Sequence, residues 1–378
     1  MADDATGALE TGARFREAGL DARVSFDPGL AWSSGALVVD TETRHLPAEQ
    51  ARERVRAIAT RAKQSGVAHI YKKTDSTLRG PIAAEFRALL GVWPELPLVY
   101  APAYPALGRT VRNGELYVDG KPLSQTPFAA DPLNPSRESS IAALLGATGA
   151  EVMPVRSSAD LRAALCRGRV LVCDGEADAD LEFVAAAVRD APCIMAGTAA
   201  MASAWAASLS RGKRRVWKPP SAALTCLVVN GSLHPASREQ LAISSIPMLA
   251  HSPAADPVAL GTRLAGLIER SRWAALCASP PCTTDPLAVA AHVARAAAHA
   301  VRLAAPDCLM VFGGDTVFAI MRELAIGEAE PHTEILPGAA VSTIWGQGTA
   351  RPMLLITKAG GFGGPDYLAR IRGILERV

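Results

Sequence analysis

Short apolar runs alternate along this chain with longer segments in which apolar residues recur at helical spacing. The predicted buried strands cover residues 36–40, 68–73, 96–103, 169–174, 192–197, 224–232, 308–314 and 352–361. Residues 47–66 and 285–303 repeat apolar positions at i, i+3, i+4 and i+7, which predicts amphipathic helices. Such alternation is typical of βαβ units, so the expected fold class is α/β, with mainly parallel sheets flanked by helices.

The segment 209–221, LSRGKRRVWKPPS, combines a basic cluster with Pro-Pro and leads directly into a new strand. A chain of 378 residues is long enough for at least two domains that each bury a core. We therefore predict an N-terminal domain over 1–219 and a C-terminal domain over 220–378. Ligands are expected at the carboxyl ends of the strands in each domain.

Composition excludes several classes of protein. The chain has 39 Lys and Arg against 37 Asp and Glu, so it lacks the bulk positive charge typical of a nucleic-acid binder. It contains no run of about 18 apolar residues, so no membrane span is expected. The polar, acidic start is not a signal peptide. Seven cysteines without a CxxC spacing indicate reduced thiols, which favours a cytoplasmic location.

Two adjacent carboxylates, Asp3 and Asp4, open a Thr-Gly turn ahead of an amphipathic helix. They are suited to a metal ion or a substrate hydroxyl, although plain helix capping accounts for them equally well. Acidic turns of this kind usually follow a strand, and none precedes them here. Either the first strand of the domain is missing from the sequence given, or the motif lies at an unanchored end.

The segment 71–80, YKKTDSTLRG, follows a predicted strand and holds Asp75, Ser76, Thr77 and Arg79. One carboxylate, two hydroxyls and one guanidinium within five residues suit a small anionic polyol, because the planar guanidinium matches a carboxylate. The alternative is a capped helix with a surface arginine.

Two further segments supply candidates for the same site. Arg44 lies just beyond the predicted strand 36–40, at another strand end. The polar stretch 101–132 contains two hairpin turn signals and offers Arg109 and Asn113. A hairpin of this kind often covers a site, although a purely structural hairpin is equally consistent with the spacing.

Three loops of the predicted C-terminal domain are suited to phosphate. Ser232 follows one strand, and residues Gly313, Gly314, Asp315 and Thr316 follow another. Glycine permits close backbone approach, and a helix start offers free N–H donors. Neither loop matches a Walker A or GxGxxG motif, and a simple capped turn remains an alternative.

The third loop is the segment KAGGFGG (358–364), whose glycines would be costly in entropy without a reason. Gly360, Gly361 and Gly363 are its candidates for nucleotide contact. Lys358 either neutralises phosphate charge or is simply a surface residue.

Taken together and in this order, the segments ADDATGALETG, KKTDSTLRG, APAYPALGRTVRNG, VVNGS, GGDT and KAGGFGGPD resemble the four-carbon acid sugar kinase family. The resemblance spans nearly the whole chain. It implies two α/β domains, with an acid sugar on the first and ATP on the second. It implies an ATP-dependent kinase for the terminal hydroxyl of an acid such as D-threonate, D-erythronate or 3-oxo-tetronate, and the forms KKTDSTLRG and GRTVRNG favour the first two. We further expect the two domains to close on their substrates. The chain departs from the family in the strand before Asp3 and in Ala5, where a branched apolar residue is usual.

The resemblance also implies roles for the candidates. Asp3, Asp4, Arg44, Asp75, Ser76, Thr77 and Arg79 are expected to bind the substrate. Apart from the resemblance, Arg109 and Asn113 of the hairpin are expected to join them, and Asp75 or Asp3 is expected to accept the proton of the attacking hydroxyl. The loops at Ser232, Gly313–Thr316 and Lys358–Gly363 are expected to bind ATP. Mg²⁺ is expected near Asp315, since it prefers oxygen ligands and phosphates.

Other classes of protein remain open at this point. One is a non-catalytic protein that binds sugar acid and nucleotide, or a kinase inactive for want of its first strand. Another is a nicotinamide-dependent dehydrogenase, against which the missing GxGxxG counts. A homodimer is open alongside a monomer. The expected partners are small molecules, with no nucleic acid and no membrane.

Overall fold

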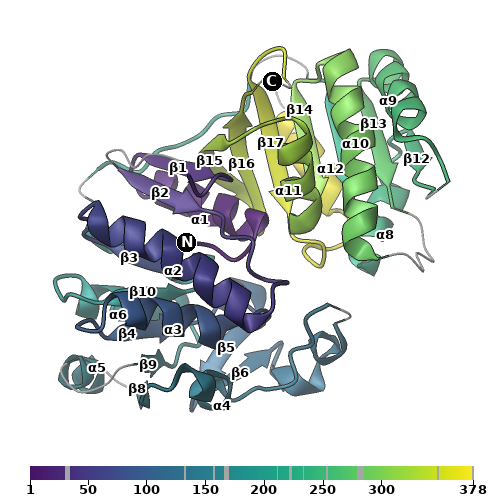
Figure 1. Ribbon diagram of the computed structural model, residues 1–378. Helices are drawn as coiled ribbons and strands as arrows, with labels where there is room; N and C mark the ends of the chain where they lie inside the picture. Colours follow the sequence, from purple (N-terminus) through teal and green to yellow (C-terminus); the bar gives the residue numbers. More distant parts are fainter. Residues whose placement is uncertain are drawn as a thin grey trace. The chain divides into compact units, whose positions relative to one another are not determined.

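The structure is a computed structural model of the chain. It describes residues 1–29, 35–131, 133–155, 158–165, 170–210, 212–220, 224–232, 234–252, 254–278, 285–346 and 349–376. The chain divides into two compact units (Figure 1). The first comprises Met1–Asp21 and Pro28–Arg214, and the second comprises Ala22–Asp27 and Arg215–Val378. Both contain parallel strands connected by helices, which confirms the predicted α/β fold class.

The first unit is built on a parallel sheet with the strand order β3-β10-β4-β9-β8. These strands are β3 (Ile70–Lys73), β4 (Leu98–Ala101), β8 (Val152–Val155), β9 (Val170–Cys173) and β10 (Ile194–Gly197). The helices are α1 (Ala5–Glu17), α2 (Ala48–Gln64), α3 (Ile82–Val92), α4 (Ile141–Leu145), α5 (Ser158–Ala164), α6 (Asp178–Val188) and α7 (Ala199–Leu209). Helix α2 packs on α3, and α7 packs against both α1 and α6.

The first residues of the chain are fixed within this unit. Ala2 forms parallel bridges to Lys73, at the end of β3, and to Asp40, which follows β2 (Ala36–Val39). Its N–H donates to Val39 O at 2.9 Å, and its carbonyl accepts from Thr41 N at 2.7 Å. Ala2 therefore stands where a strand end would, and Asp3 and Asp4 are anchored. The expectation of an unanchored end is wrong.

The predicted hairpin region forms a small antiparallel sheet of β5 (Arg109–Arg112), β6 (Glu115–Val118) and β7 (Lys121–Pro122). Asn113-Gly114 and Asp119-Gly120 form its two turns, and all four residues have positive φ. Asn and Asp followed by Gly tolerate this conformation, which is why the sequence signal was reliable.

The second unit contains a mixed sheet that runs in the order β12-β13-β11-β14-β17-β16-β15-β1. The strands β11 (Cys226–Asn230), β12 (Met248–Ala250), β13 (Trp273–Cys277), β14 (Cys308–Phe312) and β17 (Met353–Lys358) are parallel. The strands β16 (Ala339–Ile344), β15 (Glu328–Leu336) and β1 (Ala22–Ser25) continue it in antiparallel fashion. Residues 22–27 belong to this unit although they lie far N-terminal to the rest of it in the chain.

The helices of the second unit are α8 (Pro235–Ile243), α9 (Pro257–Ser271), α10 (Pro286–Ala304), α11 (Gly314–Glu323) and α12 (Tyr367–Leu375), and the first three connect parallel strands. Two of them begin with an aspartate cap followed by proline, a combination that favours a helix start. Asp256 accepts from Ala259 N at 2.8 Å at the start of α9, and Asp285 accepts from Leu287 N at 3.1 Å at the start of α10.

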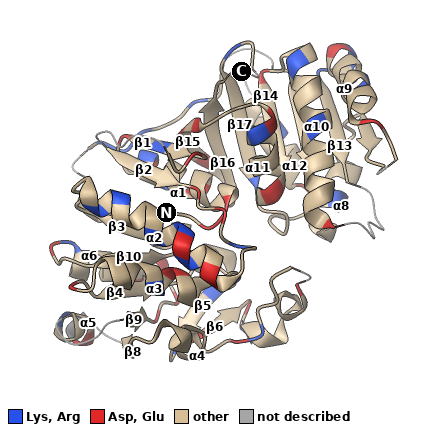
Figure 2. Ribbon diagram, viewed as in Figure 1, with Lys and Arg blue, Asp and Glu red and all other residues tan. Residues whose placement is uncertain are grey.

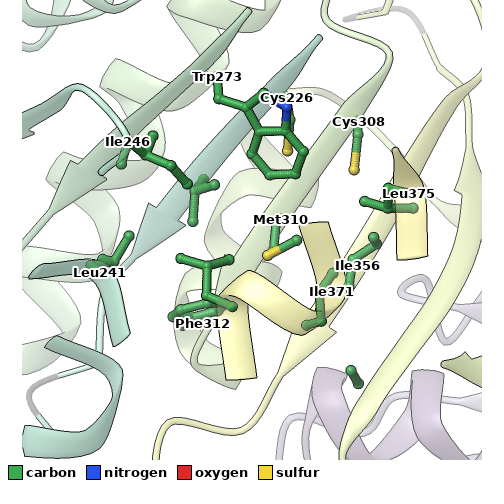
Figure 3. Close-up of a cluster of buried hydrophobic side chains, with 14 of the residues drawn as sticks. Cys226, Leu241, Ile246, Trp273, Cys308, Met310, Phe312, Ile356, Ile371 and Leu375 are labelled. Atoms are coloured by element: carbon green, nitrogen blue, oxygen red, sulfur yellow. The ribbon is translucent and has the colours of Figure 1, made fainter. Parts of the chain in front are cut away.

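A buried apolar cluster lies between the parallel strands of this unit and α12 (Figure 3). Met310 and Phe312 of β14, Ile356 of β17 and Ile371 of α12 contribute to it. In Figure 2 the Lys, Arg, Asp and Glu residues lie mainly on helices and loops, and most strands carry few of them. Among the helices of the described residues, none is both long and apolar enough to cross a bilayer.

Candidate functional site

The first unit gathers oppositely charged side chains at the ends of its strands. Arg44 follows β2, Asp75 follows β3, and Asp3 and Asp4 follow Ala2. The Arg44 guanidinium donates from Nε to Asp3 Oδ2 at 2.7 Å and from Nη1 to Asp4 Oδ2 at 2.6 Å. Its Nη2 lies 3.8 Å from Asp75 Oδ1. The three carboxylates are buried, and one arginine joins them all.

Arg79 completes this group through a bidentate pair with Asp75. Its Nε donates to Asp75 Oδ2 at 2.9 Å and its Nη2 to Oδ1 at 2.8 Å. The Thr77 amide donates to the same carboxylate at 3.0 Å, as does the Thr77 hydroxyl, while Ser76 beside it is half-buried. Asp3, Asp4, Arg44, Asp75 and Arg79 are named the acid–arginine cluster below.

The charges within this cluster keep the Asp75 carboxylate ionised. Burial alone would raise the pKa of Asp75, but the charges of Arg79 and Arg44 and the hydrogen bonds from Arg79 and Thr77 hold it well below its ordinary value. A carboxylate that is strongly acidic and fully hydrogen-bonded is a weak proton acceptor. The geometry thus suits Asp75 to holding the arginines in place.

Asp4 acts both as a helix cap and as a member of the cluster. Its Oδ1 accepts from Gly7 N at 2.9 Å, and its Oδ2 accepts from the Thr6 hydroxyl at 2.6 Å. Burial would raise the pKa of Asp4, but the charges of Arg44 and Lys73 lower it. The capping interpretation is therefore accurate but incomplete.

Two carboxylate oxygens in this region are buried and accept no hydrogen bond from the described residues: Asp3 Oδ1 and Asp40 Oδ2. Burial, followed by the negative charge of Asp4, raises the pKa of Asp40 to about 7. A buried acceptor without a donor is unfavourable, and a ligand hydroxyl would relieve this cost. The position of Asp40 at a strand end gave only a weak signal in the sequence, because that position alone could not reveal these surroundings.

Two buried lysines of β3 were also missed. Lys73 Nζ donates to Thr74 O at 3.0 Å, and its positive charge helps to lower the pKa of Asp4. Lys72 is fully buried, with Nζ 3.0 Å from Glu85 Oε2. A pair of lysines in a short strand resembles an exposed strand end, so the sequence carried no signal for their burial.

The hairpin candidates occupy different environments. The Arg109 guanidinium donates to Leu107 O and lies 5.8 Å from the centre of the Phe128 ring. Asn113 is an exposed turn residue whose backbone N–H donates to Asp174 Oδ2 at 2.8 Å. A substrate contact by either residue stays a prediction.

The predicted phosphate loops of the second unit meet at Ser232. A Cβ atom added to Gly360 would stand 2.0 Å from Ser232 Oγ, and one added to Gly313 would stand 3.7 Å from Ser232 N. A Cβ on Gly231 would stand 1.9 Å from Thr316 Oγ1. Gly231 and Gly360 are therefore required by the close approach of the loops, whereas Gly313 is required by its positive φ of 107°. The carboxyl ends of β11, β14 and β17 thus carry one site.

Helix α11 presents its first-turn amides at this site. Gly313 precedes the helix with a φ of 107°, and no side chain caps the helix start. These amides and the helix dipole favour an anion. Asp315 lies in the same turn, and one carboxylate together with phosphate oxygens is the ligand set that Mg²⁺ commonly takes. Within the described residues no group of three or more His, Cys, Asp or Glu residues could hold a metal, so phosphates would have to supply the other ligands.

Lys358, at the end of β17, is fully buried, so the surface alternative is wrong. Its ammonium donates to Ser237 Oγ at 3.2 Å and to two carbonyls of the glycine loop. Burial lowers the pKa of Lys358 to about 7. The side chain lies on the inner side of the loop, where loop carbonyls accept its hydrogen bonds.

Two solved structures resemble this chain over nearly its whole length. One, described as a putative tRNA synthase from Salmonella typhimurium, has a TM-score of 0.81 at 24% identity and covers 100% of this chain and 98% of its own. That likeness concerns the fold alone. The other, a domain of unknown function from Bordetella bronchiseptica, is a domain-swapped dimer with bound citrate. It has a TM-score of 0.51 at 30% identity and covers 99% of this chain and 97% of its own.

Sequence families match both halves of the chain. Residues 1–205 match a sugar-binding N-terminal domain, and residues 250–368 match a nucleotide-binding C-terminal domain. A D-threonate kinase from Bordetella bronchiseptica is 32% identical over 100% of this chain and 97% of its own. A 3-oxo-tetronate kinase from Methylobacterium radiotolerans is 30% identical over 98% of this chain and 97% of its own. The chain therefore belongs to the family of four-carbon acid sugar kinases.

Proposed function

We propose that this protein is an ATP-dependent kinase that phosphorylates the terminal hydroxyl of a four-carbon sugar acid, with D-threonate or D-erythronate as substrate. The acid–arginine cluster is the observation that carries the proposal. It combines guanidinium groups, which match a carboxylate, with buried carboxylate oxygens, which match hydroxyls. A small hydroxy acid offers both kinds of group within a few bonds.

The nucleotide part of the proposal is supported by the three loops that meet at Ser232. Their close backbone approach and the start of α11 provide N–H donors for a polyphosphate. Bound Mg²⁺, held by Asp315 and the phosphates, would supply charge neutralisation during the transfer. Relatives named D-threonate kinase and 3-oxo-tetronate kinase support the assignment of a kinase.

In the proposed reaction, the terminal hydroxyl oxygen forms a bond to the γ-phosphorus of ATP as the bond from that phosphorus to ADP breaks. The hydroxyl proton must pass to an acceptor. Asp3 is better suited than Asp75, because Asp3 Oδ1 accepts no hydrogen bond within the described residues, whereas Arg79 and Thr77 occupy both oxygens of Asp75. We assign Asp3 to the proton and Asp75 to the positioning of Arg44 and Arg79.

A panel of four-carbon acids tests the function. Purified protein with Mg²⁺ and ATP is incubated with D-threonate, D-erythronate, their L isomers or 3-oxo-tetronate, and ADP release is followed by a coupled assay. We expect turnover with D-threonate or D-erythronate and a phosphorylated product in the mass spectrum. Binding of acid and ATP by calorimetry without turnover would instead indicate the non-catalytic alternative. No observation favours the dehydrogenase.

Two variants distinguish the proposed roles of the Asp3 and Asp75 carboxylates. Asp3→Asn is expected to lower kcat about 100-fold or more with a small change in the KM of the acid, since loss of a positioned acceptor typically costs that much. Asp75→Asn is expected mainly to raise the KM of the acid, because Arg79 loses its partner. A near-normal kcat for Asp3→Asn combined with a large loss for Asp75→Asn would make Asp75 the acceptor.

A cytoplasmic location is proposed on the cysteines. Cys173, Cys193, Cys226, Cys277 and Cys308 are buried free thiols, while Cys166 and Cys282 lie outside the described residues. Such thiols suit a reducing compartment. A homodimer stays a prediction, which light scattering on the purified protein would check.

A further inference from the structure

The glycine loop that follows β17 (residues 359–364) directs its carbonyl groups toward the interior of the second unit. Lys358 Nζ donates to Gly360 O at 3.1 Å and to Phe362 O at 2.8 Å. Ser237 of α8 also donates to Gly360 O, at 2.5 Å. The loop is thus held from its inner side by side chains that are themselves buried.

A second buried side chain holds the rest of the loop. Gln240 of α8 is fully buried, and its Nε2 donates to Phe362 O at 3.0 Å, to Gly363 O at 2.9 Å and to Gly364 O at 3.0 Å. One amide nitrogen therefore gathers three successive carbonyls, one of which Lys358 also binds.

The inward carbonyls fix the direction of the loop amides. Across a planar trans peptide, the C=O of one residue and the N–H of the next point in opposite directions. Inward carbonyls at residues 360, 362 and 363 therefore turn the N–H groups of Gly361, Gly363 and Gly364 outward. These three residues are exposed, and their amides donate to no acceptor within the described part of the chain. The N–H of Phe362 between them donates to Ala359 O at 3.2 Å, whereas Gly363 and Gly364 are consecutive, and successive outward amides form a nest for an anion.

Within the parts of the chain that the structure describes, no acidic side chain pairs with Lys358. The side chains that face it are Ser237 and Gln240 of α8, Phe312 of β14 and Tyr367 of α12, none of them charged at neutral pH. Its Nζ lies 4.7 Å from the centre of the Phe312 ring and 5.7 Å from that of Tyr367. Across the described residues it forms no ion pair with a carboxylate. A buried ammonium without a counter-ion is costly, so an anion on the outer side of the loop would stabilise it.

We propose that Lys358 and Gln240 are positioning residues, which hold the loop carbonyls inward so that the amides of Gly361, Gly363 and Gly364 face the phosphates of the nucleotide. This inference rests on the proposed function, because it takes the nucleotide as the anion. It also assigns Lys358 a second effect: its charge acts on the phosphates through the peptide dipoles of the loop. Nucleotide binding should then favour the protonated amine, and a proton is taken up wherever the free protein holds Lys358 neutral.

The first experiment needs no variant. Binding of Mg·ADP to the full chain is measured by calorimetry from pH 7 to 9, where the ADP phosphates are ionised, in buffers of different ionisation enthalpy. Because burial lowers the pKa of Lys358 to about 7, we expect uptake of up to about one proton at pH 8. The dissociation constant should rise toward about tenfold per pH unit. A constant affinity without proton uptake would overturn the coupling. His234, whose ring lies beside Gly361, is tested separately as His234→Gln.

Variants then test the positioning. Lys358→Met and Gln240→Met are expected to raise the dissociation constant of Mg·ADP roughly 10- to 100-fold, and Lys358→Met should lose the pH dependence. Binding of D-threonate should change less than about twofold. Lys63→Met is the matched control, since Lys63 also donates to a backbone carbonyl, Val92 O, but lies on α2 of the first unit. It should bind both ligands normally.

The outcomes separate this inference from the proposed function. If the wild-type protein binds nucleotide and phosphorylates its acid, but both methionine variants bind Mg·ADP as tightly as wild type, the positioning roles are refuted and the kinase assignment stands. If wild type binds no nucleotide at any pH, both proposals fail. Equal weakening of nucleotide and acid binding in the variants would indicate general loss of structure and would also count against the inference.

Discussion

Replacing Asp40 by asparagine should change how stability depends on pH. Asp40 is 2% exposed, and burial together with the charge of Asp4 raises its pKa from an ordinary value of 3.8 to about 7. Between these two values the unfolded chain releases the proton while the folded chain keeps it. Stability of the wild-type protein therefore falls as pH rises through this window. A shift of about three pKa units corresponds to about 4 kcal/mol.

Asp40→Asn removes this contribution while keeping the shape and the acceptor for Glu42 N. We expect the variant to gain about 4 kcal/mol relative to wild type between pH 4 and pH 8. Urea unfolding followed by fluorescence at several pH values measures the difference. Asp190→Asn, at a side chain 97% exposed on the same unit, is the control and should show little change. Parallel stability curves for wild type and Asp40→Asn would refute the reasoning.

Two further substitutions test the contact between the loops at Ser232 and the buried Lys72–Glu85 pair. Gly360→Ala places a Cβ 2.0 Å from Ser232 Oγ and should raise the KM for ATP roughly tenfold. Gly373→Ala is the control, because a Cβ there meets no atom within 4 Å and should leave the KM for ATP unchanged. Equal KM values for the two variants would contradict the prediction. Glu85→Gln leaves the Lys72 ammonium buried without its partner and should cost about 3–5 kcal/mol in urea unfolding. Adding Lys72→Met should restore much of this, and a loss below about 1 kcal/mol in the single variant would argue against a charged pair.

The sequence predicted the central strands well, because fully buried parallel strands appear as continuous apolar runs. The run 308–314 contains β14, and the run 352–361 contains β17. Strands with one polar face were missed. Strand β15 (Glu328–Leu336) alternates buried and half-buried residues and includes glutamates and a proline, so its composition resembles a loop.

The candidate site was predictable where it depends on strand ends. Arg44 follows β2 and Asp75 follows β3, and Ala2 links the ends of these two strands through parallel bridges, so the residues after them come together. The direction in which a loop side chain points could not be predicted in this way. Lys358 was expected either to neutralise phosphate charge or to lie at the surface. The side chains that surround it, Ser237 and Phe312, come from distant parts of the chain. Asp40 likewise owes its raised pKa to neighbours that only the fold assembles.

Strand β1 has a consequence for biosynthesis. Val24 pairs with Ala329, 305 positions later, so a ribosome must make most of the protein before this strand finds its partner. Pairing over such a distance along the chain is slow. Until β1 and β15 pair, the backbone edges of both strands stay open to other chains. A fragment beginning at residue 215 would lack β1 and keep the outer edge of β15 unpaired. Expression of the nucleotide-binding half by itself is therefore expected to yield aggregates unless residues 22–27 are supplied.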